Sequence, residues 1–373
     1  MPTGGDALEP LLRLTLVPGI GPQRLAALLR QYGSAERVFE TPTRQLALLP
    51  GFGLDLARRV ADFGGVAGDA PLRHALDVLR RAGAVALTPD DPLYPEAFRT
   101  VSEPPFLLFA AGDLELLRAP AIAFVGTRSP SPYGRAAAID LAGGLARAGY
   151  AIVSGMARGI DTEAHQAALA GGGTTVGVLG HGIDSVYPPE NRALFRQVRE
   201  RGLLLTEFAP GERPKAGNFP RRNRLIAALS RAVVVVEMGL KSGAQHTVNY
   251  ALEHGQEVMA VPGPIGAATS AGTNQLIREG ARMVTSVEEI LEELEGVGAA
   301  RPRRPRPAPV QPALPLLAPD EDRVVRLLAS GAMHVDSLAA ESGLRSGELL
   351  GVLLELELRG VVESLPAKHF RRR

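Results

Sequence analysis

AIAFVGTRSPSPYGRAAAIDLAGGLARAG, residues 121–149, sets the fold class of this chain. It opens with an apolar run at 121–125, and a short apolar run that ends in glycine predicts a strand buried on both faces. A loop of small residues and prolines follows. Residues 133–148 then place apolar side chains at helical spacing and end at Gly149, which predicts a helix with a glycine stop. The stretch is one strand–loop–helix unit.

The same alternation continues to about residue 296. Further apolar runs predict strands at 151–153, 174–179, 203–205, 232–237 and 257–261. Segments with helical periodicity lie between them, at 161–170, 191–201, 222–230, 243–254 and 273–280. Alternating strands and helices build a mainly parallel sheet with helices on both faces. We therefore predict an α/β fold, a doubly wound sheet, for residues 89–296.

Three segments flank this sheet. Residues 1–88 have helical spacing and two Gly-x-Gly turns, which fit either a DNA-binding helix-hairpin-helix or, as we prefer, a plain helical packing unit. Residues 297–318 are rich in proline and arginine, with no acidic residue in 301–307, which is typical of an extended linker. Residues 319–373 have the outline of a winged helix with a basic tail.

The overall composition excludes several classes of protein. The 373 residues carry 41 Lys and Arg against 40 Asp and Glu, so the chain is not a uniformly basic nucleic-acid binder. The absence of cysteine excludes disulfides, thiolate zinc sites and a catalytic thiol, and the seven histidines lack metal-ligand spacing. No export signal and no apolar run of about 18 residues occurs, so we expect a cytoplasmic protein with no metal site.

Loops that follow strands are the candidate sites, because open α/β sheets bind ligands at the carboxyl ends of their strands. The first loop carries Arg128 and precedes a helix, which favours contact with an anion. It lacks Gly-x-Gly-x-x-Gly, so a dinucleotide is disfavoured. In the second loop, Asp161 is predicted to be a helix N-cap rather than a catalytic acid, and His165 to be structural.

Residues 214–224 and 237–243 supply the remaining cations. The first segment combines Lys215 and three arginines with one ring, Phe219, a mixture that suits the backbone and bases of a single-stranded nucleic acid. The alternative is a solvated loop with the ring in the core, and one of its arginines is expected to pack structurally. The second segment places Lys241 at a helix start, but Leu240 replaces the glycine of a phosphate-binding loop, so ATP hydrolysis is not indicated.

With these loops in view, the chain resembles the DprA/Smf family, the DNA-processing proteins of natural transformation. The resemblance covers residues 89–290 and lies in ordered motifs, GTR at 126–128, SGMARGID at 154–161, YPPEN at 187–191, FPRRNR at 219–224 and VPG at 261–263. The segments DPLYP at 91–95 and PP at 104–105 match the family's lead-in. The chain departs from the family at 242–248, where it has SGAQHTV.

The resemblance implies an extended Rossmann-like fold that binds single-stranded DNA, forms a homodimer and loads RecA recombinase, with single-strand-binding protein as a further partner. It implies no cofactor and no enzymatic turnover. Carried onto this sequence, it gives candidate DNA-binding residues Gly126, Thr127, Arg128, Lys215, Phe219, Arg221, Arg222, Asn223, Arg224, Lys241, Ser242 and Gly243.

Two other functions are weighed against this one. A nucleotide-binding enzyme of the nucleoside-monophosphate phosphoribohydrolase type needs a Pro-Gly-Gly-x-Gly-Thr loop after a strand, whereas the chain has Gly171–Thr174 before one. A regulator that binds DNA through its winged helix needs a basic recognition helix. The helix predicted at 346–359 carries three glutamates and one arginine, which favours contact with protein instead.

Overall fold

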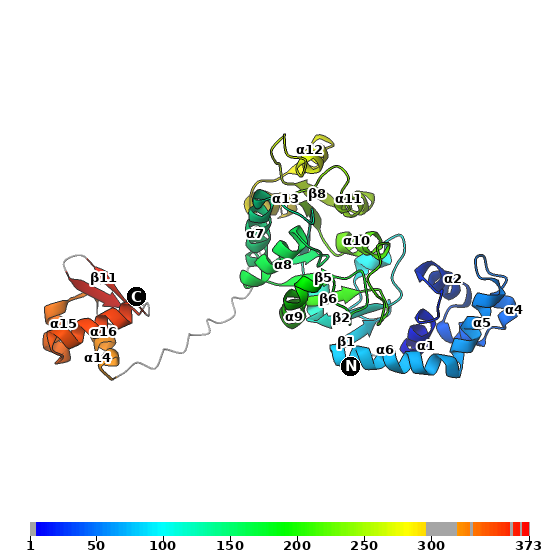
Figure 1. The fold of residues 1–373 in the computed structure, drawn as a ribbon, viewed down its shortest axis with the longest axis horizontal. Helices are drawn as coiled ribbons and strands as arrows, with labels where there is room; N and C mark the ends of the chain where they lie inside the picture. The colour runs from blue at the N-terminus through cyan, green and yellow to red at the C-terminus, as the bar shows by residue number, and fades with distance from the viewer. Residues whose placement is uncertain (1–4, 296–318, 329–330, 359–360, 366–367, 373) are drawn as a thin grey trace. The chain divides into compact units, whose positions relative to one another are not determined.

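The computed structural model describes residues 5–295, 319–328, 331–358, 361–365 and 368–372. The predicted linker, 297–318, lies outside the described residues. The chain divides into two compact units, Met1–Arg304 and Pro305–Arg373, and each is described by itself (Figure 1).

A nine-stranded mixed sheet forms the centre of the first unit. Its strands are β1 Ala84–Leu87, β2 Leu108–Gly112, β3 Ala121–Val125, β4 Ala151–Ser154, β5 Thr175–Val178, β6 Leu203–Thr206, β7 Ala232–Val235, β8 Glu257–Ala260 and β9 Arg282–Met283. Their order is β1-β2-β6-β5-β4-β3-β7-β8-β9. Neighbours from β6 to β9 are parallel, whereas β2 pairs antiparallel with both β1 and β6. The doubly wound parallel core is as predicted, and the antiparallel edge was not foreseen.

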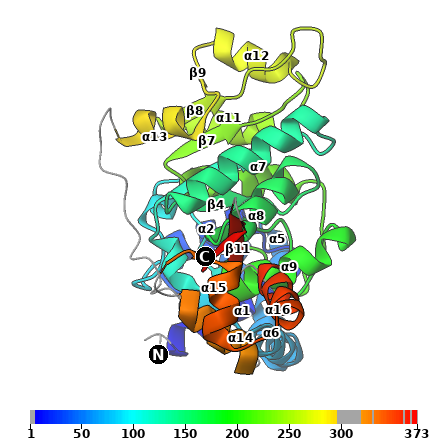
Figure 2. The ribbon, with the colours of Figure 1, turned by 90° about the vertical axis from the view of Figure 1, so that its left-hand side faces the viewer.

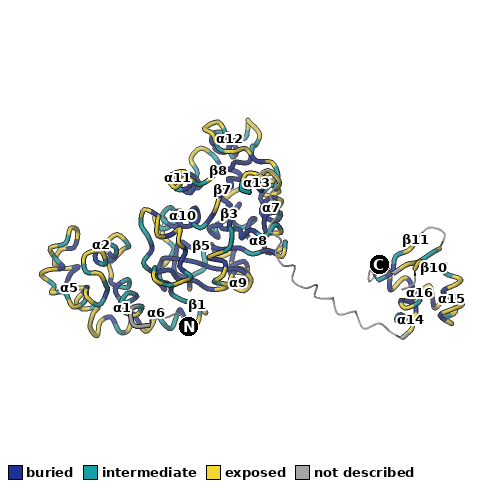
Figure 3. The backbone as a smooth tube through the Cα atoms, turned by 180° about the vertical axis from the view of Figure 1, so that it is seen from behind, coloured by how far each residue is buried: buried dark blue, intermediate teal, exposed yellow. Residues whose placement is uncertain are grey.

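Helices cover both faces of this sheet, as the buried strands and exposed outer helix surfaces of Figure 3 show. One face carries α6 Asp69–Ala82, α7 Pro132–Arg147, α8 Ile160–Ala170, α9 Arg192–Arg201 and α13 Val287–Glu295. The other carries α10 Asn218–Ala228, α11 Ala244–Glu253 and α12 Ala271–Arg278. Alternate residues of β3 enter the two layers, so the strand is fully buried, as its unbroken apolar run predicts.

The amino-terminal helices pack around a core of their own. They are α1 Gly5–Thr15, α2 Pro22–Tyr32, α3 Ala35–Glu40, α4 Thr43–Leu46 and α5 Gly53–Gly64. The first predicted Gly-x-Gly turn immediately precedes α2, and the second ends at Gly53, the first residue of α5. Gly19 and Gly51 in these turns have φ of 95° and 78°, a backbone conformation that glycine adopts without strain.

The second unit is a small winged helix, drawn in orange and red in Figure 2. It contains α14 Pro319–Leu327, β10 Met333–His334, α15 Val335–Ser342, α16 Ser346–Leu358, β11 Val362–Leu365 and β12 His369–Arg372. The sequence predicted that the winged helix ends in a basic tail but did not predict that residues 369–372 of this tail form a strand. These residues form β12, which pairs with both β10 and β11 at the centre of the three-stranded sheet.

Helix α10 begins earlier than the sequence predicted. We placed its start at residue 222, whereas the helix begins at Asn218 and includes Pro220 in its first turn. Proline is tolerated there because first-turn N–H groups have no partner within the helix. Phe219 and the arginines after it therefore lie on a rigid helix rather than on a loop.

Candidate nucleic-acid interface

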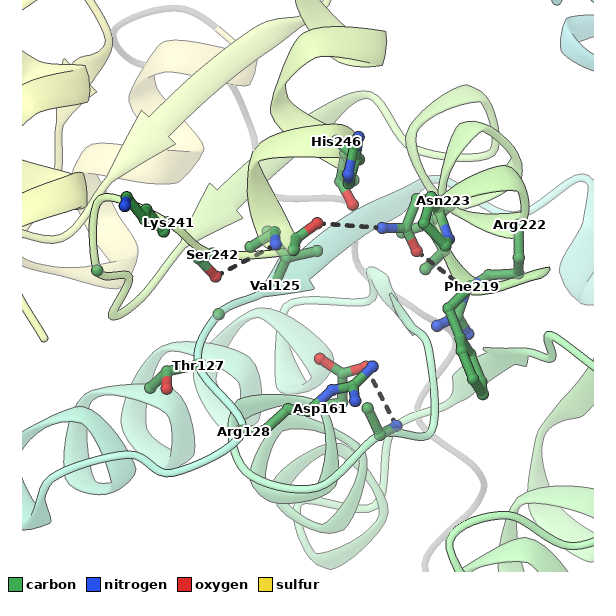
Figure 4. Close-up of a pocket in the computed structure, with 18 of the residues that line it drawn as sticks. Val125, Thr127, Arg128, Asp161, Phe219, Arg222, Asn223, Lys241, Ser242 and His246 are labelled. Atoms are coloured by element: carbon green, nitrogen blue, oxygen red, sulfur yellow. Dashed lines mark hydrogen bonds between the residues drawn. The ribbon is translucent and has the colours of Figure 1, made fainter. Parts of the chain in front are cut away.

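A cavity of about 800 Å³ opens beside the ends of β3 and β7 (Figure 4). The two strands are parallel neighbours, yet the helices that follow them, α7 and α11, cover opposite faces of the sheet. This is the topological switch point, where open α/β folds bind ligands. The cavity is lined by the β3–α7 and β7–α11 loops, the first turns of α10 and α11, and residues 268–269.

Arg128 and Phe219 share this cavity. The Arg128 guanidinium carbon lies 5.6 Å from the centre of the Phe219 ring, within the range of a cation–π contact. The Phe219 ring also packs against the Tyr187 ring, with 5.5 Å between their centres. Arg128 is exposed, and no carboxylate of the described ranges pairs with it. One space therefore holds an unpaired cation and an aromatic face.

The loop that presents Arg128 is held tightly in place. A Cβ added at Gly126 would lie 2.6 Å from Ile160 Cγ1, so only glycine fits there. The Thr127 amide donates to the Glu237 carbonyl at 2.7 Å, and the Thr127 hydroxyl accepts from the Ser129 amide at 3.2 Å. Gly126 and Thr127 thus position Arg128, because they fix the path of the backbone on which it stands.

The amino end of α7 already holds a carboxylate of the chain itself. Glu237 follows β7 and is 1% exposed, and its Oε2 accepts from the Ser131 amide at 2.8 Å. A Cβ at Gly134 would lie 2.0 Å from the same oxygen. The sequence predicted an open anion site at this helix end, and that prediction is wrong, because Glu237 occupies the position where an anion would bind. The anion contact predicted for this loop therefore rests on the exposed Arg128 side chain and stays a prediction.

Two arginines of the 221–224 segment share one buried carboxylate. The Arg224 guanidinium, 2% exposed, donates to both oxygens of Glu207 at 3.0 and 2.8 Å. Arg221 pairs with the same carboxylate at 2.7 Å, and burial lowers the pKa of Arg221. Neither arginine lines the main cavity. The prediction of Arg224 as a DNA contact is wrong, because its guanidinium is buried against Glu207. Arg221 keeps 23% of its side chain exposed and lines a second cavity, so its contact with DNA stays a prediction.

Arg222 forms part of the floor of the cavity. Its Nη1 donates to the Gly155 carbonyl at 2.6 Å and also to the Val178 carbonyl, and the residue is 4% exposed. Burial lowers the pKa of Arg222 to about 10, and nearby Asp161 opposes that effect. Arg222 supports the β4–α8 loop rather than facing solvent, so we correct its assignment from a contact residue to a positioning residue.

Asp161 is not the N-cap that the sequence predicted. It is the second residue of α8, whose N-cap is Gly159. The Asp161 carboxylate turns back to accept from the amides of Gly155 and Ala157, at 3.0 and 3.2 Å. Burial raises the pKa of Asp161, whereas Arg222 and these amides lower it. His165 is structural, as predicted: it is fully buried, its Nδ1 lies 2.6 Å from the Thr175 hydroxyl, and burial lowers its pKa to about 3.

The two candidate lysines lie in different surroundings. Lys241 lines the main cavity and is exposed, with no ion pair among the residues that the structure describes. Lys215 pairs with Glu212 at 2.7 Å and lines a second cavity, not the main one. Lys241 is therefore the stronger candidate for contact with an anion bound near Arg128.

The β7–α11 loop and the start of α11 complete the lining. Ser242 accepts from the Ala244 amide at 3.3 Å, and the Gly243 carbonyl accepts from Asn223 at 3.5 Å. His246 also lines the cavity and is exposed. His246 was not predicted as a site residue, since it lies where the chain departs from the family pattern. Its position in the first turn of a helix that follows a strand end was the available signal.

The second cavity, of about 870 Å³, lies between the amino-terminal helices and the sheet. The first Gly-x-Gly turn lines it together with Lys215 and Arg221. The Gly19 and Pro18 carbonyls of this turn accept from Arg24 and Arg59, at 2.7 and 2.8 Å. Two arginines close to the turn are thus engaged by its own backbone.

The described ranges lack two further kinds of feature. None of their helices combines the length and apolar character needed to cross a membrane. No group of three or more His, Cys, Asp or Glu residues there is arranged to hold a metal ion.

Comparison with known proteins places the chain in a family. The family model for DNA recombination-mediator protein A matches residues 85–295, more than half of the chain. The chain belongs to the DprA/Smf family. A DprA winged-helix model matches 305–368, and a SAM-like helix-hairpin-helix tandem matches 11–63. The last match confirms a small helical amino-terminal domain of the helix-hairpin-helix type, and contact of its turns with DNA stays a prediction.

Relatives within the DprA/Smf family are similar to this chain along most of its length. Protein Smf of Synechocystis is 32% identical over 387 residues, covering 96% of this chain and 96% of its own. The X-ray structure of DprA from Streptococcus pneumoniae superposes with a TM-score of 0.65 at 34% identity, covering 76% of this chain and 96% of that one. A DprA structure from Helicobacter pylori superposes with a TM-score of 0.52 at 32% identity, covering 57% of this chain and 95% of that one. The description of that structure concerns its single-stranded DNA binding mode.

Proposed function

We propose that this DprA/Smf protein binds single-stranded DNA without sequence preference, in the cavity at the switch point of its sheet. The observation behind the proposal is the unpaired Arg128 guanidinium over the Phe219 ring, with Lys241 lining the same space. The Helicobacter pylori relative is described as binding single-stranded DNA, which supports the same use of the shared fold.

The chemistry of the cavity favours a single strand over a duplex. A base can stack on Phe219 only if it is free of its neighbours, as in a single strand, and such stacking contributes about 1–3 kcal/mol per base. Arg128 and Lys241 supply positive charge for the phosphates. Binding should weaken as the salt concentration rises, because the release of counterions from the DNA then contributes less free energy. Both contacts are tolerant of sequence.

We propose binding without catalytic turnover. The carboxylates close to the cavity, Asp161 and Glu237, each accept from backbone amides and hold the fold together. Neither is free to act as a general base toward a bound ligand. Glu237 also fills the helix end that a nucleotide phosphate would use, which weighs against the phosphoribohydrolase alternative.

The family resemblance extends the proposal to the partners. We propose that the protein acts in the cytoplasm as a homodimer, loads RecA onto the bound strand in the presence of single-strand-binding protein, and protects incoming DNA during natural transformation. A RecA filament assay on a strand coated with single-strand-binding protein tests this step. Equal filament formation with and without the protein would contradict it.

The central test is a salt titration of oligo-dT and duplex binding. Arg128→Ala and Lys241→Ala should each weaken oligo-dT binding and reduce the slope against salt by about 0.7, as expected for one lost phosphate contact on a single strand. Arg278→Ala is the charge-matched control, because Arg278 is exposed on α12 and does not line the cavity. Binding of duplex as tight as that of oligo-dT, or parent-like binding by both site variants, would reject the proposal.

A further inference from the structure

A separate groove of about 440 Å³ lies between α6 and α9 of the first unit. Its floor is apolar, with Phe195 and Leu204 almost fully buried. It shares no lining residue with the main cavity. The groove is distinguished by its cations, since four arginines line it, Arg81, Arg192, Arg196 and Arg199.

Three of these arginines form a stripe along one face of α9. Arg192, Arg196 and Arg199 stand at i, i+4 and i+7, which places them on the same side of the helix over about 10 Å. All three are exposed, and none of their side chains forms an ion pair or hydrogen bond with another residue that the structure describes. Arg201, at the end of the same helix, behaves differently, because it donates to the Leu169 carbonyl at 2.6 Å. The stripe therefore presents three cations to solvent.

The acidic groups close to this stripe are already engaged. Asp184, which also lines the groove, accepts from the Gly211 amide at 2.9 Å. Asp77 on α6 pairs with both Arg80 and Arg81. Glu200, the acidic residue on α9, does not line the groove. The α9 arginines therefore repel one another along the helix, and a bound polyanion would relieve that repulsion.

The groove and the main cavity meet at one short segment. Val186 lines the groove, and the next residue, Tyr187, lines the main cavity and packs on Phe219. Helix α9 begins at Arg192, five residues after Tyr187. A strand that leaves the cavity past Tyr187 thus comes to the Arg192 end of the stripe first.

We infer that the α9 stripe, Arg192, Arg196 and Arg199, is a second contact for the sugar–phosphate backbone of a single strand whose other end occupies the main cavity. The inference rests on the proposed single-strand binding. It assigns base contact to the cavity and phosphate contact alone to the groove, because the groove offers guanidinium groups and no exposed ring. The bound strand is then longer than the cavity can hold.

The test compares binding of two lengths of oligo-dT, about 6 and about 30 nucleotides. The shorter oligomer fits within the site size of a single binding fold, and the longer one extends well beyond it. The variant is the triple change Arg192→Gln, Arg196→Gln and Arg199→Gln in the full chain. Its matched control is the triple lysine variant at the same positions, which keeps the charge. Glutamine and lysine both favour helix, so α9 is retained in each, and circular dichroism checks this.

We expect the glutamine variant to bind the short oligomer as the parent does. For the long oligomer its slope against salt should fall by about 2, which makes binding about a hundredfold weaker at about 0.1 M salt. The lysine variant should stay close to the parent. An unchanged slope for the glutamine variant with the long oligomer would overturn the inference. This is also the result expected if the groove binds an acidic protein rather than DNA. A parent chain that binds neither oligomer would reject the proposed function itself.

Discussion

Arg222 offers the sharpest test of how the cavity floor is built. Arg222→Met removes a buried guanidinium that donates to the carbonyls of Gly155 and Val178 and lies close to Asp161. Two buried carbonyls then lack a donor, at about 1–3 kcal/mol each. Breaking a buried pair of charges costs about 3–5 kcal/mol, and we expect a loss of that size in the free energy of unfolding.

The loss should depend on pH because Asp161 remains. Burial raises the pKa of Asp161 and Arg222 lowers it, so removing Arg222 raises that pKa further. A carboxyl group whose pKa is higher in the folded than in the unfolded state binds more protons when the protein is folded. The free energy of unfolding therefore falls as pH rises from the unfolded-state pKa to the folded-state pKa. The penalty of Arg222→Met should therefore be smaller near pH ~4 than near pH ~7, by about 1.4 kcal/mol for each unit of added shift.

Urea unfolding followed by tyrosine fluorescence measures this loss. The chain has no tryptophan, and its six tyrosines all lie before residue 295, so the signal reports the first unit alone. In a double-mutant cycle with Asp161→Asn, the pH dependence of the Arg222 effect should disappear. A loss that is the same at both pH values, or strictly additive single changes, would refute the proposed coupling of Arg222 and Asp161.

Three further predictions concern single residues. Phe219→Ala should weaken binding of oligo-dT by about 1–3 kcal/mol in a fluorescence titration, and Phe219→Tyr should not, because a stacking face remains. Lys215→Ala should weaken binding less than Lys241→Ala in the same assay, since Glu212 already pairs with Lys215, and the opposite ranking would contradict the cavity assignment. His165 stays neutral in the folded protein, with its pKa lowered to about 3, so the parent should lose stability as pH falls below about 6.5, by up to about 1.4 kcal/mol per unit. His165→Gln should lose less over that range in urea unfolding, and an unchanged pH profile would contradict the burial argument.

Much of the sheet could be predicted because its strands are apolar runs between glycine-rich loops. The runs at 121–125 and 232–237 correspond to β3 and β7, the two strands beside the cavity. The antiparallel strands β1 and β2 were missed, since β1 is only half-buried and neither belongs to a strand–helix repeat. Pairing with β6, more than ninety residues along the chain, is what makes β2 part of the sheet.

The sequence by itself determined the α/β alternation and the placing of Arg128, Phe219 and Lys241 close to strand ends, because local periodicity and order along the chain are enough for that. Only the tertiary structure decided which cations remain free. Glu207 lies on another segment of the chain and takes Arg221 and Arg224, and Glu237 fills the end of α7. Charges pair through space rather than along the sequence, so a buried carboxylate can turn a basic motif inward while Arg128 stays exposed.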